Sequence, residues 1–227
     1  MGAGRYAAKV LGPAALQRAP GLAANFIKQA FDRAVDGVGP MPGAAAAADA
    51  KLERFDGDRA RAIREVVDSH VTMAGAQGFV TNIGGLVTMA VAIPANVSGL
   101  ALLQAHMVAG IAHLRGYDLA DPRVRNAVLA CMLGGDGVSS LIKSKKLPSS
   151  PMAIATAPAH DPALDQRIAS EVATELFARV AGKRTLATIG RKMPIVGGGF
   201  GMVSDGFATY QVGRYAAREL KARSGTS

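Results

Sequence analysis

The sequence has few aromatic residues and almost no cysteine. It contains no tryptophan and one cysteine, Cys131, and aromatic residues make up 5% of its 227 residues. A single cysteine cannot form a disulfide within the chain, which excludes the disulfide-rich class of small secreted domains and fits a reducing cytoplasm. The N-terminus also lacks the apolar core and cleavage site of a secretory signal peptide. We therefore expect a cytoplasmic protein whose core is built from Ala, Gly, Val, Leu and Met.

Charge is absent from a long internal stretch. No Asp, Glu, Lys or Arg occurs between Asp68 and Arg115, whereas 19% of all residues are charged. Pro94 lacks an N–H and interrupts a helix there, so residues 78–114 are predicted to form two apolar arms. As a helix the second arm, 95–114, is about 30 Å long, close to the thickness of a bilayer core. The missing charges indicate that the arms avoid water, and leave open whether they face lipid or the protein interior.

A second apolar stretch, Met193 to Gly213, has a similar plan, although the likeness is too loose for an internal repeat. The proline steps and their nearby glycines are Gly84, Gly85 and Pro94 in the first stretch and Pro194, Gly197 and Gly198 in the second. Helix caps recur along the chain, at Asp58, at Asp121-Pro122 and at Asp161-Pro162, whereas no alternating strand pattern stands out. The predicted fold class is therefore all-α, a helical bundle with two glycine- and proline-rich apolar helical hairpins.

The chain is predicted to have two parts. Residues 1–50 hold a cationic amphipathic helix within 14–36, followed by a linker rich in Gly, Pro and Ala. Residues 51–227 form one helical domain. Prolines and serines at about 144–160 predict a flexible loop inside this domain.

The uncharged stretch and the residues after it are similar to a known family. The run from His70 to Gly134, which contains "LRGYDLADPRVR", and the later "GRKMPIVGGGFGMVSDGFATYQVGRYA" resemble the bacterial EcsC family over roughly residues 58–220. The resemblance implies a helical protein that is cytoplasmic or membrane-associated, from a family named after a gene beside an ABC transporter operon. It implies no reaction and no set of catalytic residues.

Four polar residues in the uncharged stretch are candidates for chemistry. His106 and His113 lie about two turns apart on one side of a predicted helix, too far for one helix to chelate a metal with both. With His70 nearby, the three histidines would support a hydrolase or metal-dependent enzyme. Otherwise they are, with Gln104, hydrogen-bonded polar residues of an apolar interior. No complete nucleophile motif or phosphate-binding loop occurs, so no catalytic residue, metal or cofactor is assigned.

Basic residues flank the second apolar stretch. The segment from Arg179 to Ser227 contains nine Lys or Arg and only two acidic residues, Asp205 and Glu219. The whole chain has a net charge of +9. Basic residues beside apolar helices are attracted to acidic lipid headgroups. The candidate residues for binding lipid or another anion are Arg179, Lys183, Arg184, Arg191, Lys192, Arg214 and Arg218. Nucleic acid is disfavoured as a partner, because neither a stacking platform nor a known binding motif occurs.

The leading functional hypothesis is a non-enzymatic protein that associates with the inner face of the cell membrane through its apolar hairpins and basic flanks. A full membrane span is disfavoured, because the arms carry polar side chains that are costly in lipid. The alternatives are the histidine-dependent enzyme and a soluble carrier that holds an apolar ligand in its small-residue interior. Further candidate partners are a second copy of the chain and a membrane protein such as a transporter.

Overall fold

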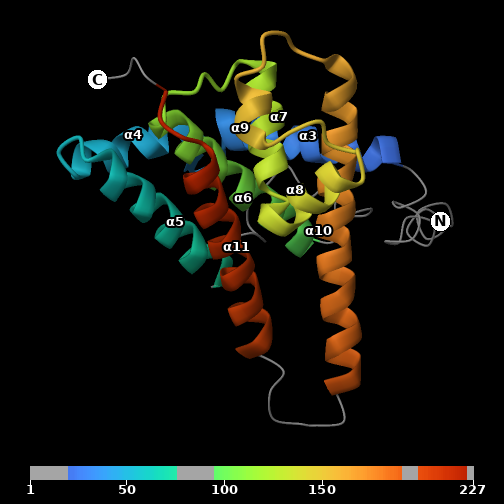
Figure 1. Ribbon diagram of the computed structural model, residues 1–227. Coiled ribbons are helices and arrows are strands. Elements are labelled where there is room, and N and C mark those ends of the chain that lie inside the picture. Colours follow the sequence, from blue (N-terminus) through green and yellow to red (C-terminus); the bar gives the residue numbers. More distant parts are fainter. Residues whose placement is uncertain (1–19, 76–94, 191–198, 224–227) are drawn as a thin grey trace, which may run out of the picture.

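The computed structural model describes residues 20–75, 95–190 and 199–223, which form a helical bundle (Figure 1). The helices are α3 (Pro20–Asp36), α4 (Ala44–Arg54), α5 (Arg59–Gly75), α6 (Ala95–Leu114), α7 (Pro122–Cys131), α8 (Gly134–Lys143), α9 (Pro151–Ala155), α10 (Pro162–Gly190) and α11 (Gly199–Glu219). Two short strands, β1 (Gly37–Val38) and β2 (Met41–Pro42), pair antiparallel between α3 and α4. The all-α prediction is confirmed. The hairpin residues Gly84, Gly85, Pro94, Pro194, Gly197 and Gly198 lie outside the described residues.

The second half of the uncharged stretch is the central helix of the bundle. Every side chain of α6 from Leu100 to Ala112 is buried, on all sides of the helix. Helices α3, α4, α5, α7 and α11 pack around it. A helix that is apolar around its whole circumference is stable in water only when it is covered in this way. Within the described part of the chain, no helix is long and apolar enough to cross a membrane.

Helix α3 belongs to the same core. Phe26, Ile27 and Phe31 are among its largest fully buried side chains, and α3 packs against α6 and α10. The chain then reverses in the β1–β2 hairpin, where Gly37 has a positive φ of 91°. A Cβ atom at Gly37 would lie 2.8 Å from the backbone nitrogen of Gly43, so only glycine fits this turn. The hairpin has no counterpart in the sequence-based prediction.

Predicted caps occupy the expected helix ends. Asp58 Oδ1 accepts a hydrogen bond from the Arg61 amide at the start of α5. The Asp121 and Asp161 carboxylates do the same at the starts of α7 and α10, where prolines occupy the first helical position. At the end of α6, the amides of Gly116 and Tyr117 bond to the carbonyls of His113 and Ala112. Gly116 has a φ of 82°, as a Schellman cap requires.

The segment predicted as a loop at about 144–160 contains a helical turn. Its residues 151–155 form α9, which Ser150 caps and which buries Pro151, Ile154 and Ala155. The Met152 amide donates a hydrogen bond to the Glu219 carboxylate at the end of α11. These contacts join α9 to the bundle, so this part of the segment is a packed element.

Two long helices extend beyond the rest of the molecule. α10 and α11 project past the other helices at one end, drawn at the bottom of Figure 1. Within the described residues, α10 packs mainly against α3 and α7, and α11 packs mainly against α5 and α6. The projecting ends are the C-terminal end of α10 and the N-terminal end of α11.

Two helical glycines provide a matched test of the packing around α6. A Cβ atom at Gly213 of α11 would lie 2.9 Å from Val67 Cγ1 and 3.0 Å from Met107 Sδ, whereas one at Gly110 of α6 would meet no atom closer than 3.6 Å. Overpacking costs about 1–3 kcal/mol, and replacing a helical glycine by alanine otherwise contributes up to about 1 kcal/mol. We therefore expect Gly213→Ala to lower the free energy of unfolding and Gly110→Ala to raise it. Urea unfolding measures both; stabilisation by both would contradict the close approach of α11 to α5 and α6.

Candidate functional site

A pair of buried histidines connects α5, α6 and the hairpin. His70 on α5 and His106 on α6 are 4% and 5% exposed. Their rings face each other, with His70 Nε2 at 2.8 Å from His106 Nδ1. Each outer ring nitrogen meets a backbone carbonyl. His70 Nδ1 lies 2.6 Å from the Val66 oxygen, and His106 Nε2 lies 3.0 Å from the Pro42 oxygen of β2.

Burial favours the neutral form of the two imidazoles at neutral pH. It lowers the pKa of His70 to about 3, with the nearby His106 as the second cause, although the contact with the Val66 carbonyl opposes the shift. Burial also lowers the pKa of His106, against the opposing effect of the Pro42 carbonyl. Lys51 on α4 lowers the pKa of both rings through its positive charge. Among the described residues, no carboxylate contributes to the pKa shift of either ring.

His113 does not join this pair. It lies two turns further along α6, partly exposed, with its Nε2 at 2.7 Å from Asp49 Oδ1 of α4. These two side chains border a surface cavity of about 350 Å³ between α4, the start of α5 and the end of α6. In the described ranges, no three His, Cys, Asp or Glu side chains converge as metal ligands would. The structure thus brings together two of the three predicted histidines.

Gln104 is the fourth predicted polar residue of the interior. It is fully buried on α6, and its Nε2 lies 3.4 Å from Thr209 Oγ1 of α11. Its Oε1 has no hydrogen-bond partner among the described residues. Gln104 therefore connects α6 to α11, while His106 connects α6 to α5 and the hairpin.

The predicted basic residues that the structure describes lie on the outer face of α11. Arg214 and Arg218 are exposed and share this face with Phe207 and Tyr210, because the four positions recur at helical spacing. The Arg214 guanidinium lies 5.6 Å from the centre of the Tyr210 ring, and its Nη1 lies 3.4 Å from the Tyr210 hydroxyl. Neither arginine forms an ion pair with a carboxylate in the described part of the chain. We call these four residues the α11 face.

The other predicted basic residues are placed less completely. Arg179, Lys183 and Arg184 belong to the C-terminal half of α10, the half whose end projects in Figure 1. Arg191 and Lys192 lie outside the described residues.

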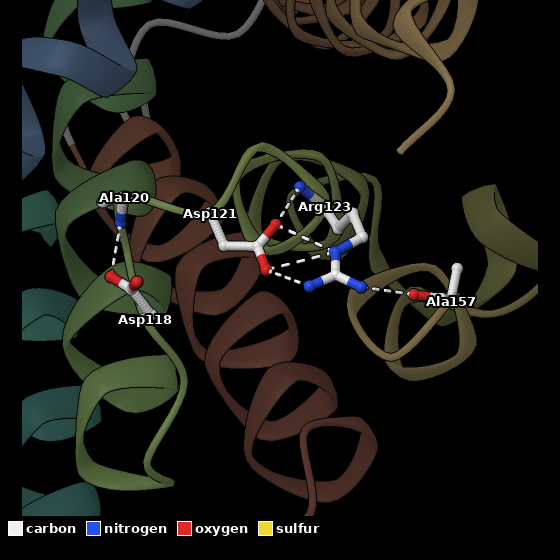
Figure 2. A network of polar contacts seen from close by, with 5 residues as sticks. All are labelled: Asp118, Ala120, Asp121, Arg123 and Ala157. Carbon is white, nitrogen blue, oxygen red and sulfur yellow. Dashed lines mark hydrogen bonds and ion pairs between the residues drawn. The ribbon is translucent and has the colours of Figure 1, made fainter. Parts of the chain in front are cut away.

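The most distinctive piece of the sequence, "RGYDLADPRVR" at 115–125, forms a structural junction (Figure 2). The Asp121 carboxylate caps α7 and also receives the Arg123 guanidinium, with Nη2 at 2.6 Å and Nε at 3.0 Å. Arg123 Nη1 donates to the Ala157 carbonyl, beyond the end of α9. The hydrogen bonds from Arg123 lower the pKa of Asp121, which strengthens the pair at neutral pH.

The same piece also holds the end of α11 and contacts α3. Arg115 Nη2 donates to the Ala217 carbonyl, and the Tyr117 hydroxyl donates to the Lys221 carbonyl. Arg125 pairs with Asp32 of α3 at 3.2 Å. The segment between α6 and α7 is therefore tied to α3, α9 and α11 at once.

A comparison with protein families places the chain. The model of the EcsC protein family matches residues 47–224. The chain belongs to the EcsC family. This confirms the resemblance that its sequence indicated, and no curated protein or solved structure gives a significant match.

The EcsC match begins within α4 and so omits α3, although α3 packs in the same core as the matched helices. The sequence-based candidates omit Phe207 and Tyr210, the exposed aromatic half of the α11 face. Their helical spacing with Arg214 and Arg218 was the available signal. The pairing of His70 with His106 had no local signal, because the two residues are 36 positions apart.

The histidine pair predicts a loss of stability in mild acid. The unfolded chain binds protons at both histidines as the pH falls below about 6.5, whereas the lowered pKa values delay binding in the folded state. The free energy of unfolding therefore falls with pH in this range, and His70 alone accounts for about 2 kcal/mol between pH 7.5 and 5.0. Urea unfolding at the two pH values measures the loss.

The double variant His113→Gln/His160→Gln is the control for this prediction. Its two histidines pair with Asp49 and Asp165 nearer the surface. The acid-dependent loss should persist in this variant. If it disappeared there, the surface pairs would be its source and the buried pair would not.

Proposed function

We propose that this EcsC family member is a non-enzymatic peripheral protein of acidic membrane surfaces. The α11 face and the projecting ends of α10 and α11 make the contact. The supporting observation is the juxtaposition of two exposed aromatic rings with two arginines on one helix face. Phe207 is 59% exposed and Tyr210 38%, next to the exposed Arg214 and Arg218.

The exposure of these rings argues for a partner. Large hydrophobic side chains are exposed at three positions of the described chain, and two of them, Phe207 and Tyr210, lie on this face; the third is Ile142. Aromatic rings favour the boundary between headgroups and acyl chains, where the ring is apolar and a hydroxyl can stay hydrated. Arginines on the same face then meet the headgroup phosphates.

Charge favours an acidic bilayer as this partner. The protein carries a net charge of +9. Arg179, Lys183 and Arg184 belong to the C-terminal half of α10, and the sequence places Arg191 and Lys192 directly after this helix. Each basic residue near an acidic surface contributes about 1 kcal/mol of attraction. The binding proposed is peripheral, because the long uncharged helix α6 is already covered by protein.

Sedimentation with lipid vesicles tests this proposal. The purified full chain should bind vesicles that contain phosphatidylglycerol and should not bind vesicles of phosphatidylcholine alone. Arg214→Gln/Arg218→Gln should weaken binding about 30-fold, from about 1 kcal/mol for each charge. Phe207→Ser/Tyr210→Ser should also weaken binding, but should leave its dependence on salt concentration nearly unchanged.

Arg61→Gln/Arg167→Gln is the matched control, with the same net charge of +7 (+9 less two) as the arginine variant of the α11 face. Both residues are exposed near the N-terminal ends of α5 and α10. The control should bind nearly as well as the wild type. An equal loss of vesicle binding in both variants would mean that only the net charge matters and that the α11 face has no specific role. A wild-type protein that stays in the supernatant with acidic vesicles would contradict the proposal.

A further inference from the structure

We propose that the His70–His106 pair is a proton-binding site: it takes up one proton between its two rings, and this proton fastens the β1–β2 hairpin to α5 and α6. The proposal is independent of membrane binding. It rests on the number of hydrogen bonds that the geometry offers and the number of protons available to make them.

The pair offers three hydrogen-bonding contacts. They join Val66 O to His70 Nδ1, His70 Nε2 to His106 Nδ1, and His106 Nε2 to Pro42 O. Each carbonyl oxygen is only an acceptor, so all three contacts are hydrogen bonds only when the rings carry three protons. Two neutral imidazoles carry two. The neutral pair therefore leaves one contact without a hydrogen, and one added proton completes all three.

The gap between the rings fits a proton and is too short for a metal ion. Two imidazole nitrogens that bind one tetrahedral zinc ion at about 2.0–2.1 Å are about 3.3 Å apart. His70 Nε2 and His106 Nδ1 are 2.8 Å apart, the length of an ordinary hydrogen bond. No third metal ligand completes a site in the described part of the chain.

The surroundings limit the pair to one added proton and delay its uptake. Lys51 of α4 is the charged side chain that acts on both rings, and each protonated ring would repel the other. On α5, Asp68 is exposed on the opposite face from His70. Helix α11 presents Gly206 and Gly213 to α5, neither of which can carry charge. The pair is therefore neutral at pH 7.5, takes up its one proton well below the ordinary imidazole pKa, and resists a second.

The added proton affects the hairpin because only one of the three contacts involves a hairpin residue. The Val66 contact lies within α5, whereas the Pro42 contact joins the hairpin to α6. In the neutral pair, a hydrogen on His106 Nδ1 leaves Pro42 O without its imidazole donor. In the singly protonated pair all three contacts are made at once, so Pro42 O always has its imidazole donor, whereas the neutral pair can also exist in the tautomer that lacks it. Acid then tightens the hairpin locally, while the stability of the whole domain declines.

Histidine ¹⁵N NMR and amide hydrogen exchange test this inference on the full chain. As the pH falls from 7.5 to the acid limit of the folded state, the pair should gain one proton, with an N–H between the rings. The protection factors of the Val38 and Met41 amides should rise about fivefold over the same range, the equivalent of one hydrogen bond of about 1 kcal/mol. Protection in the helical core should not rise with them.

His70→Gln is the decisive variant. A glutamine amide can donate to or accept from His106 Nδ1, so hairpin protection should become independent of pH. His113→Gln is the control and should retain the wild-type response. If His70→Gln does not fold, the wild-type titration decides alone. Each of four results would overturn the proposal. They are two independent histidine titrations, a pair that stays neutral until the protein unfolds, hairpin protection that decreases as the pH is lowered, and a bound metal ion.

Discussion

The architecture follows from the need to cover one helix on every side. α6 has no charged residue and is buried around its circumference from Leu100 to Ala112. An α-helix has room for several neighbours, and α3, α4, α5, α7, α10 and α11 all pack against this one. Two of them, α3 and α11, come from opposite ends of the chain. Because the apolar surface of α6 is satisfied internally, charge and exposed aromatic groups are left to the outer faces of the surrounding helices.

Covering α6 also isolates its polar residues. His106 and Gln104 lie within the apolar core, where each polar atom needs a partner because water is excluded. The partners come from the surrounding elements: His70 and Pro42 for the ring nitrogens of His106, and Thr209 for Gln104 Nε2, whereas Gln104 Oε1 has none among the described residues. The same contacts that satisfy these atoms therefore fix which elements lie beside α6. A change of protonation at His106 can reach the hairpin for this reason.

The sequence predicted features that depend on neighbouring residues. Asp58, Asp121 and Asp161 are caps because a carboxylate needs only the amides of the next turn. The burial of α6 was left open, because the absence of charge is the same in lipid and in a protein core. The contact of His70 with His106, the hairpin and the helix α9 depend on partners far away in the chain. Helical periodicity selects a face of a helix but does not identify what that face meets.

The residues that make the family recognisable are separate from those proposed to act. Asp121, Arg123 and Tyr117 lie in the most distinctive segment, and each bonds to groups that hold α7, α9 or α11 in place. Such contacts explain a shared fold without specifying an activity. Phe207 and Arg214 contribute little to the core, since both are exposed on a helix whose opposite face already packs against α5 and α6. A hydrophobic ring that stability does not require at the surface is better explained by what it binds, and its arginine neighbours favour an anion.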